Sequence, residues 1–492
     1  MKKTLTLLTF LPAICLGQWM QIGSAINGEA AGDGSGRSIS INSNGTVIAI
    51  GANYNQGSGP SATSAGGHVR VYENVNANWV QIGSDIDGDG GDQTGQYVSL
   101  SQDGSTVAVG EPISAVNGSL SGQVRVFRNV NNNWIQIGSS INGDSFNWQT
   151  GSVSLSSDGS ILAVGSRGAD VSGLGPFSGK ARIYSFQSGN WVQIGNDINA
   201  SGPEDYFGVS ISLSSDGSIV AIGALGDISN NEIGYISVFE NVAGTWTQIG
   251  SNINGSTPAG EFGNSVSLSA DGSTVATGEY LSVPGGSAKV FKNINGIWTQ
   301  IGNTILGNAG DFLGYSVSLS ANGNILGIGA YGSDVNGVDA GRTIVFKNQF
   351  GNWIQIGNVI NGASSGDFSG IAVSLSSDGS IVATGATGDD VNGNNAGHVR
   401  VFENSEALNV DDISFYNNCY VFPNPTSSSL TIKCESDIIA YELFSILGQL
   451  ISSGKANGNK EIKIKLDGLP SGNYLVKVKT TNKTYYTKIV KE

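Results

Sequence analysis

The sequence predicts an all-β protein, a seven-bladed β-propeller followed by a small β-sandwich. Three observations lead to this prediction. The motif Trp-x-Gln-Ile-Gly recurs seven times, at spacings of 52 to 60 residues. Glycine makes up 73 of 492 residues and charged residues only 13%, a composition poor in strong helix formers. After residue 404 the repeat stops, and a lysine-rich stretch without tryptophan follows. We therefore expect a signal peptide at 1–17, the propeller at 18–404, a linker at 405–418 and the sandwich at 419–492.

The N-terminal segment is typical of an export signal. Lys2 and Lys3 precede an apolar run over 5–14, and small residues end at Gly17. The run is too short to cross a bilayer as a helix. No other segment approaches 18 apolar residues, so we expect an exported protein without a transmembrane segment.

Each repeat carries the marks of four strands. Alternating runs such as Ser-Val-Ser-Leu-Ser at 265–269 precede an Asp-Gly or Asn-Gly pair. An apolar run such as 219–223 follows, and then a Gly-x-Val-Arg-Val-Phe segment such as 397–402. Alternation predicts strands, and Asp-Gly predicts a hairpin in which both central residues adopt positive φ. Four strands per unit at a period near 50 are the signature of a β-propeller.

The order of these marks predicts how the ring closes. The repeats begin with a tryptophan strand at 19–23 and end with the Val-Arg-Val-Phe strand at 399–402. We expect these two segments to pair, because this leaves no open sheet edge in the last blade. The seven repeated tryptophans are expected to pack between neighbouring blades.

The repeat resembles the FG-GAP repeat of integrin-like propellers. The resemblance rests on Phe262-Gly263, the strand Ser265–Leu268, Asp271-Gly272 and pairs such as Gly223-Ala224. The integrin type carries a calcium loop between its first two strands. Only a tight Asp-Gly turn stands there in this sequence, so the calcium sites of that family do not carry over.

One acidic loop has the spacing of a calcium site elsewhere in the repeat. Asp85, Asp87 and Asp89 alternate, with Asp92 following, so that their carboxylates could converge on one hard cation. The twelfth position holds Gln96 instead of a glutamate. The alternative is a decorated structural turn, because the segment overlays ordinary Ile-Asn-Gly segments of other repeats.

Four aromatic residues fall in loops outside the shared pattern and are candidates to face a ligand: Tyr54, Trp148, Tyr280 and Tyr331. His68 and His398 share one repeat position with Gln, Lys, Tyr, Ser and Arg. This variety predicts a surface position of a strand. The two histidines of the chain also argue against a histidine-based triad, a His-rich zinc site and a haem ligand set.

Charge limits the classes of partner. The net charge is −15, and the region 19–404 alone carries −18. Such a body repels phosphate backbones and anionic membrane surfaces, so we expect neither nucleic acid nor an anionic membrane as a partner. The sequence shows no recognisable set of catalytic residues, and calcium is its only cofactor candidate. We therefore expect a secreted binding or adhesion module. The alternative is a secreted polysaccharide-active hydrolase or lyase, and a structural surface-layer component is a third reading.

The tail over 419–492 carries alternating strands at 461–466 and 474–479, which suggest a small β-sandwich. It closely resembles the type A C-terminal sorting domain of the bacterial type IX secretion system. The residues that match its motifs include Pro423, Asn424, Pro425, Gly448, Gly472, Tyr474 and Lys488. The resemblance implies recognition by the type IX machinery and a secreted or surface-attached product. Cys419 and Cys434 form a disulfide in one reading and are separate buried thiols in the other.

Overall fold

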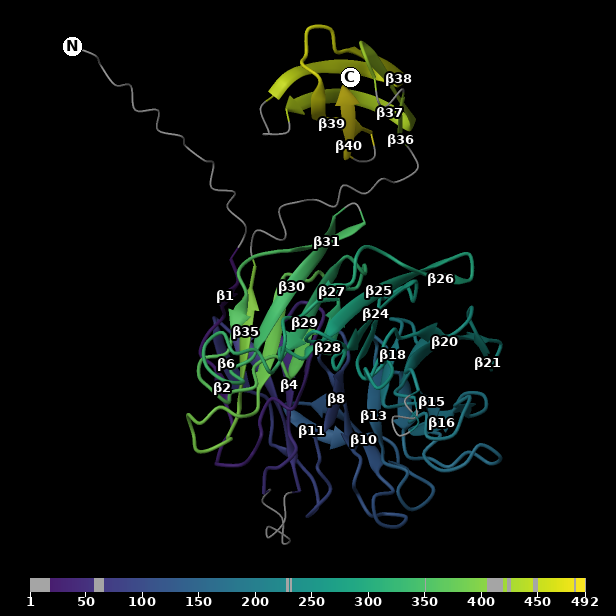
Figure 1. Cartoon of the computed structure of the whole chain (residues 1–492), viewed down its shortest axis with the longest axis vertical. Helices are drawn as coiled ribbons and strands as arrows, with labels where there is room; N and C mark the ends of the chain where they lie inside the picture. Colours follow the sequence, from purple (N-terminus) through teal and green to yellow (C-terminus); the bar gives the residue numbers. More distant parts are fainter. Residues whose placement is uncertain are drawn as a thin grey trace, which may run out of the picture. The chain divides into compact units, whose positions relative to one another are not determined.

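The computed structural model describes residues 18–56, 66–226, 230, 232–349, 351–404, 419–422, 426–445, 450–481 and 484–491. The expected signal peptide at 1–17 and linker at 405–418 lie outside the described residues. The chain divides into two compact units, Met1–Ala407 and Leu408–Glu492 (Figure 1). In the described part of the chain, no helix is long and apolar enough to cross a membrane.

The described residues of the first unit form seven five-stranded antiparallel sheets. One sheet has the order β3-β4-β5-β6, and the short β7 pairs with the start of β5. Its strands are β3 (Ser38–Ile41), β4 (Val47–Ala52), β5 (His68–Val75), β6 (Asn78–Gln81) and β7 (Ile86–Asp87). The fifth strand was not expected. Two residues are too short to show a periodic pattern in the sequence.

The other six sheets repeat this order, and their strands are as follows. The second has β8 (Tyr97–Leu100), β9 (Thr106–Glu111), β10 (Gln123–Val130), β11 (Asn133–Gln136) and β12 (Ile141–Asn142). The third has β13 (Thr150–Leu155), β14 (Ile161–Ser166), β15 (Lys180–Gln187), β16 (Asn190–Gln193) and β17 (Ile198–Asn199). The fourth has β18 (Ser210–Leu213), β19 (Ile219–Ala224), β20 (Tyr235–Val242), β21 (Thr245–Gln248) and β22 (Ile253–Asn254). The fifth has β23 (Val266–Leu268), β24 (Thr274–Glu279), β25 (Ser287–Ile294), β26 (Ile297–Gln300) and β27 (Ile305–Leu306). The sixth has β28 (Leu313–Leu319), β29 (Ile325–Ala330), β30 (Arg342–Gln349), β31 (Asn352–Gln355) and β32 (Ile360–Asn361). The last has β33 (Ala372–Leu375), β34 (Ile381–Ala386), β35 (His398–Glu403), β1 (Met20–Gln21) and β2 (Ile26–Asn27).

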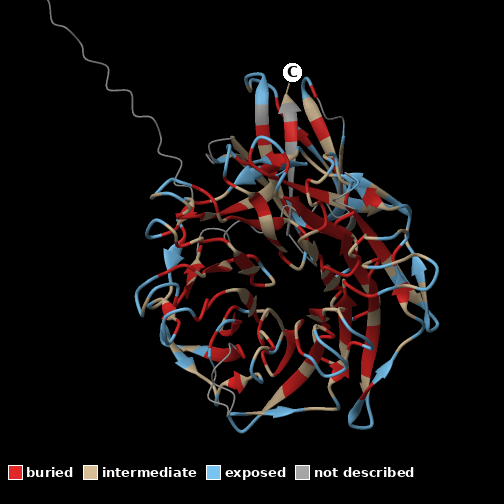
Figure 2. Cartoon of the chain, turned by 60° about the horizontal axis from the view of Figure 1, so that its bottom comes forward, coloured by how far each residue is buried: buried red, intermediate tan, exposed pale blue. Residues whose placement is uncertain are grey.

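Burial follows the position of a strand in its sheet. All six residues of β4 are buried, because a neighbouring sheet covers each face. This explains the continuous apolar run, since a strand buried on both faces does not alternate. The third strand is buried in its first half and exposed at its end, and the fourth strand is mostly exposed. Figure 2 shows this gradient from buried inner strands to exposed outer ones.

The first strands contact one another in a closed cycle, from β3 through β8, β13, β18, β23, β28 and β33 back to β3. The alternating serines explain how they join. The Oγ of Ser40 accepts a hydrogen bond from the N–H of Leu100 in the next sheet at 2.9 Å. The same bond recurs at every step, and Ser374 to Ile41 closes the cycle at 3.1 Å. This ring of sheets around one axis is a β-propeller architecture.

The first and last repeats close the ring as expected. Met20 pairs with Glu403, and Gln21 pairs with Phe402, so β1 supplies the outer strand beside β35 (Figure 1). Each repeated tryptophan donates its Nε1–H to the isoleucine carbonyl of the preceding repeat, at 2.8–3.1 Å. Trp19 makes this bond to Ile356 and so joins the two ends of the repeat region. The predicted closure and the packing of the tryptophans between sheets are confirmed.

The Asp-Gly turns differ from the expected geometry. Only the glycine has a positive φ, for example +77° at Gly104. Asp103 instead accepts hydrogen bonds from Ser101 Oγ and the Ser105 N–H, at 2.6 and 2.9 Å. A Cβ on Gly104 would lie 2.9 Å from Cβ of Val47 in the neighbouring sheet. Glycine is therefore required here by close packing as well as by its conformation.

The second unit contains one five-stranded sheet with its own core. The strands are β36 (Cys419–Phe422), β37 (Ser429–Ser445), β38 (Leu450–Lys465), β39 (Gly472–Thr480) and β40 (Thr484–Lys491). The order is β36-β37-β39-β40, with β38 also paired to β37. Cys434 is disulfide-bonded, and the register sets Cys419 opposite it.

Candidate functional site

One pocket of about 540 Å³ lies on the axis of the ring, where the first strands begin. Each of the seven sheets contributes a residue at or near the beginning of its first strand: Ser38, Tyr97, Ser152, Ser210, Ser265, Ser316 and Ala372. We call this the axial pocket. Its volume falls in the range of small-molecule sites. A smaller pocket of about 220 Å³, the distal pocket, lies where the same strands end.

Segments that precede the first strand or follow the second strand of several sheets bring polar groups to the axial pocket. Arg37 immediately precedes β3, and its Nη1 donates to the Oη of Tyr315 at 3.1 Å. Tyr315 lies on β28, so this bond reaches past the intervening sheet of β33. The amide of Gln96 contacts Arg37 and Asn53. A second cation, Arg167, donates its Nε–H to Gln149 at 2.8 Å.

Aromatic rings form one wall of the axial pocket. The rings of Tyr280 and Tyr315 meet edge to face at 5.1 Å, and those of Tyr315 and Tyr331 at 4.7 Å. Tyr331 also stacks on Phe312 at 5.2 Å. Such pairs hold ring orientation, so the wall is a rigid set of ring edges and phenol groups.

Tyr280 also carries a charged partner. Its Oη donates to Oε2 of Glu261 at 2.7 Å. Burial and this hydrogen bond raise the pKa of Tyr280, so the phenol stays protonated at neutral pH. The pocket thus offers two guanidinium groups, one carboxylate, phenols and amides.

The four aromatic candidates occupy different environments. Tyr280 lines the axial pocket, and Tyr331 contacts the pocket residue Tyr315 without lining the pocket itself. Tyr54 is 52% exposed in the segment after β4. Trp148 is 8% exposed, and its ring is covered by Lys180 Nζ at 4.4 Å and the guanidinium of Arg182 at 5.4 Å. Arg37, Tyr315 and Glu261 were not identified from the sequence, because they lie in or just before the first strands, in segments that differ from repeat to repeat.

The expected surface position of the two histidines is wrong. His68 is 1% exposed and His398 3%. The start of the third strand is covered by the short fifth strand, as the pairing of His68 with Asp87 shows. In every sheet a side chain at the first or third residue of this strand meets an acidic partner. The pairs are His68 with Asp85, Arg125 with Glu111, Lys180 with Asp197, Tyr235 with Asp205, Lys289 with Glu279, Arg342 with Asp311 and His398 with Asp389.

The four acids of the candidate calcium loop are spread over different contacts. Asp85 Oδ2 lies 3.2 Å from Nδ1 of His68, and Asp87 belongs to β7. Asp89 is exposed, and its carbonyl accepts the N–H of Asp92 at 3.2 Å. Asp92 is buried, and its pKa rises to about 6 because of burial and the nearby Glu111 and Asp89. Among the described residues, only Asp85 of the four belongs to a group of three or more close metal-ligating side chains.

In the tail, Gly472 opens β39, and Tyr474 is buried and donates to the carbonyl of Pro470 at 2.7 Å. Lys488 lies in β40 opposite Leu475. Four other motif residues lie outside the described residues: Pro423, Asn424, Pro425 and Gly448.

Residues 420–492 match the secretion system C-terminal sorting domain. No curated protein matches the chain. Similar solved structures include Kuenenia stuttgartiensis hydrazine synthase, at 12% identity and TM-score 0.46, over 74% of this chain and 94% of that one. The WD40 repeats of RRP9 match at 10% identity and TM-score 0.46, over 78% and 99%. The Dos1 propeller matches at 12% identity and TM-score 0.44, over 78% and 96%.

The fold and the tail define the class. This chain is a β-propeller protein with a type IX sorting tail, and that tail marks it for secretion to the extracellular space or the cell surface.

Proposed function

We propose that residues 18–404 are a seven-bladed, FG-GAP-like β-propeller that serves as an extracellular binding or adhesion module. The N-terminal 1–17 would direct export, and the 405–418 segment would link the propeller to a sandwich-like sorting domain at 419–492. Within that domain we propose Cys419 as the disulfide partner of Cys434.

The axial pocket supports this proposal more than any other feature. It combines a built aromatic wall with fixed donors, which is the arrangement of a site that recognises a ligand by shape and a few polar contacts. Arg37 and Tyr280 have partners within the wall and are only partly buried. They therefore hold their positions before a ligand arrives, which lowers the entropic cost of binding.

The test is a glycan array and a surface-protein binding screen with the full chain, followed by variants. Arg37→Ala and Tyr280→Ala should weaken binding of the identified ligand about tenfold or more, the loss typical of central contact residues. Gln102→Ala is the matched control, because Gln102 lines the distal pocket instead. Equal affinity of Arg37→Ala, Tyr280→Ala and the unaltered protein would reject the axial pocket as the site.

One observation favours the alternative of a polysaccharide-active hydrolase or lyase. The pKa values of Asp92 and Glu111 are both raised, as a general acid requires. However, Glu111 is fully buried against Arg125 and Asp92 is only 8% exposed, so neither carboxyl group is open to a polymer. Cleavage of a polysaccharide in an activity screen, lost in Asp92→Asn, would favour the enzyme over the binding module.

A further inference from the structure

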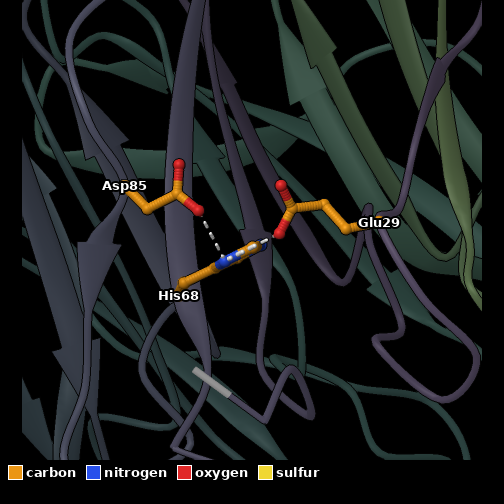
Figure 3. A group of neighbouring side chains, drawn as sticks. All are labelled: Glu29, His68 and Asp85. Carbon is orange, nitrogen blue, oxygen red and sulfur yellow. Dashed lines mark ion pairs between the residues drawn. The ribbon is translucent and has the colours of Figure 1, made fainter. Parts of the chain in front are cut away.

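A cluster outside the axial pocket brings together three side chains from separate elements (Figure 3). Glu29 follows β2, His68 begins β5 and Asp85 immediately precedes β7. The Nδ1 of His68 lies 3.2 Å from Oδ2 of Asp85 and 3.9 Å from Oε2 of Glu29. The three residues form a group in which the candidate ligand atoms lie within 4.8 Å of one another.

The two distances from His68 Nδ1 to the carboxylate oxygens are close to the separation of neighbouring ligand atoms around one metal ion. Zinc binds imidazole nitrogen and carboxylate oxygen at about 2.0–2.2 Å in tetrahedral geometry, so neighbouring ligand atoms lie about 3.3–3.5 Å apart. The two measured distances differ from this range by less than about half an ångström. A pocket of about 440 Å³ lined by the same three residues leaves room for a water ligand and a path of entry.

Outer partners already orient both carboxylates toward the histidine. Gln81 Nε2 donates to Oδ1 of Asp85 at 2.6 Å, which leaves Oδ2 facing His68. Arg70 Nη1 lies 3.4 Å from Oε1 of Glu29, which leaves Oε2 facing His68. Metal-binding carboxylates are commonly held in this way by a second layer of hydrogen bonds.

The histidine supplies the nitrogen atom of the group. His68 is 1% exposed, and its Nδ1 is the ring atom that faces both carboxylates, whereas the ring atom without a hydrogen bond is Nε2. The ring is thus held by packing and by the two carboxylates that face its Nδ1. Arg70 pairs with the outer oxygen of Glu29, and a dication placed between the two oxygens that face Nδ1 would be attracted by both carboxylates.

In the described part of the chain, His398 occupies the same strand position as His68 but has no counterpart of the Glu29 carboxylate. It also begins a third strand, and its Nδ1 lies 3.0 Å from Oδ2 of Asp389. Within the described residues, His398 belongs to no group of three close metal-ligating side chains. Glu29 therefore distinguishes the His68 cluster from an ordinary buried pair.

We propose that Glu29, His68 and Asp85 bind one zinc ion, with water completing the coordination. A nitrogen ligand with two carboxylates favours a first-row transition ion over calcium or magnesium, which prefer oxygen ligands alone. Because Glu29 follows β2 in the closing sheet and His68 begins the third strand of the next sheet, the ion would join the N-terminal segment to its neighbour in the ring.

The test is zinc binding by the full chain after chelator treatment, measured by calorimetry and by bound-metal analysis. We expect one zinc per chain. Glu29→Gln, His68→Gln and Asp85→Asn should each lower the affinity at least tenfold, since even outer-layer changes cost about 10- to 100-fold. His398→Gln should bind zinc like the unaltered protein. Replacement by cobalt should give the visible absorption of a tetrahedral site.

Three outcomes would overturn the proposal: no stoichiometric zinc, equal affinity in His68→Gln, or equal loss in His398→Gln. Glu29 is 48% exposed in its side chain, so Glu29→Gln tests the site even if a buried variant fails to fold. A calcium titration belongs in the same experiment. Calcium binding that survives His68→Gln and is lost in Asp89→Asn, in a chain that takes up no zinc, would replace the zinc site with the expected acidic loop.

Discussion

Asp92 is buried near two other carboxyl groups, those of Glu111 and Asp89. Burial, Glu111 and Asp89 raise its pKa to about 6, against the opposing effects of Arg125 and Ser114. The unfolded chain has an aspartate pKa of about 3.9. Between these values the native state binds the proton more tightly. The stability that Asp92 contributes is therefore complete below about pH 4 and is lost as the pH rises through about 6.

Asp92→Asn should remove this dependence. At pH 7.5 we expect the variant to be more stable than the unaltered protein by on the order of 2–3 kcal/mol, because no buried charge is formed. The gain should shrink toward pH 4. Urea unfolding at the two pH values measures both differences, and an equal gain at both would contradict the assignment.

Asp103 provides a control, because its pKa is lowered whereas that of Asp92 is raised. Burial acts to raise its pKa, but hydrogen bonds from Ser101 and Ser105 hold it below the usual value. Its contribution to stability is present at neutral pH and is lost as the pH falls through that lowered pKa. Asp103→Asn should therefore destabilise the protein at pH 7.5 and have a smaller effect in acid.

The position of His68 shows why single residues were hard to place from the sequence. Variation among repeats indicated a surface site, yet each sheet buries this region with its own acidic partner. Sequence spacing does not reveal such pairs, because the partner stands at a different place from sheet to sheet: Asp85 before β7 for His68, but Glu111 at the end of β9 for Arg125. Glu29 was missed for the same reason.

At the scale of elements, the pairing of strand β1 was predictable. The repeat region begins with a tryptophan segment and ends with a Val-Arg-Val-Phe segment, and these two segments are hairpin partners in the other repeats. The fifth strands were not predictable, because two residues carry no period. The Asp-Gly turns were predicted, but their geometry was not. Only the glycine has a positive φ, and the aspartate side chain holds the turn by accepting hydrogen bonds from neighbouring residues.

Deleting residues 18–23 should lower the melting temperature by several degrees or more. The deletion removes β1, the buried Trp19 and its bond to Ile356, and the Ile22 carbonyl that accepts the Nε1–H of Trp79. Loss of one buried tryptophan alone costs about 3–5 kcal/mol.

Calorimetry with Met20→Ala as control measures this effect. Met20 is 57% exposed on the same strand, so its truncation should leave the melt nearly unchanged. A deletion variant with the same melting temperature as the unaltered protein would show that β1 does not close the ring.

At the scale of the whole molecule, backbone groups join all seven sheets at the distal end. Ser43 N–H donates to the Gln102 carbonyl, Gln102 to Ser157, and so on around the ring, until Ser377 donates back to Ser43, each at 2.8–2.9 Å. The number of repeats predicted such a ring. The hydrogen bonds between sheets were not predictable, because they depend on how tightly seven sheets curve around one axis.

The sorting tail takes no part in this closure. The described strands of the seven ring sheets all come from residues before 405, and the tail packs around its own core of residues such as Ile432, Leu443 and Val476. Removing 419–492 therefore opens no sheet edge in the ring. The two properties of the chain, folding of the ring and passage to the cell exterior, should be separable.

A chain that lacks 419–492 should keep the melting temperature of the ring but fail to reach the medium or the cell surface. The reason is that residues 420–492 match the domain that the type IX machinery recognises. Fractionation of the native host, with immunodetection of the ring, measures how much of the protein reaches the medium or the cell surface. Calorimetry of the protein retained in the cell measures the melting temperature of the ring. Fusion of 405–492 to an exported carrier protein should send the carrier out. Secretion of the shortened chain at the level of the full one would mean that the export signal lies elsewhere in the molecule.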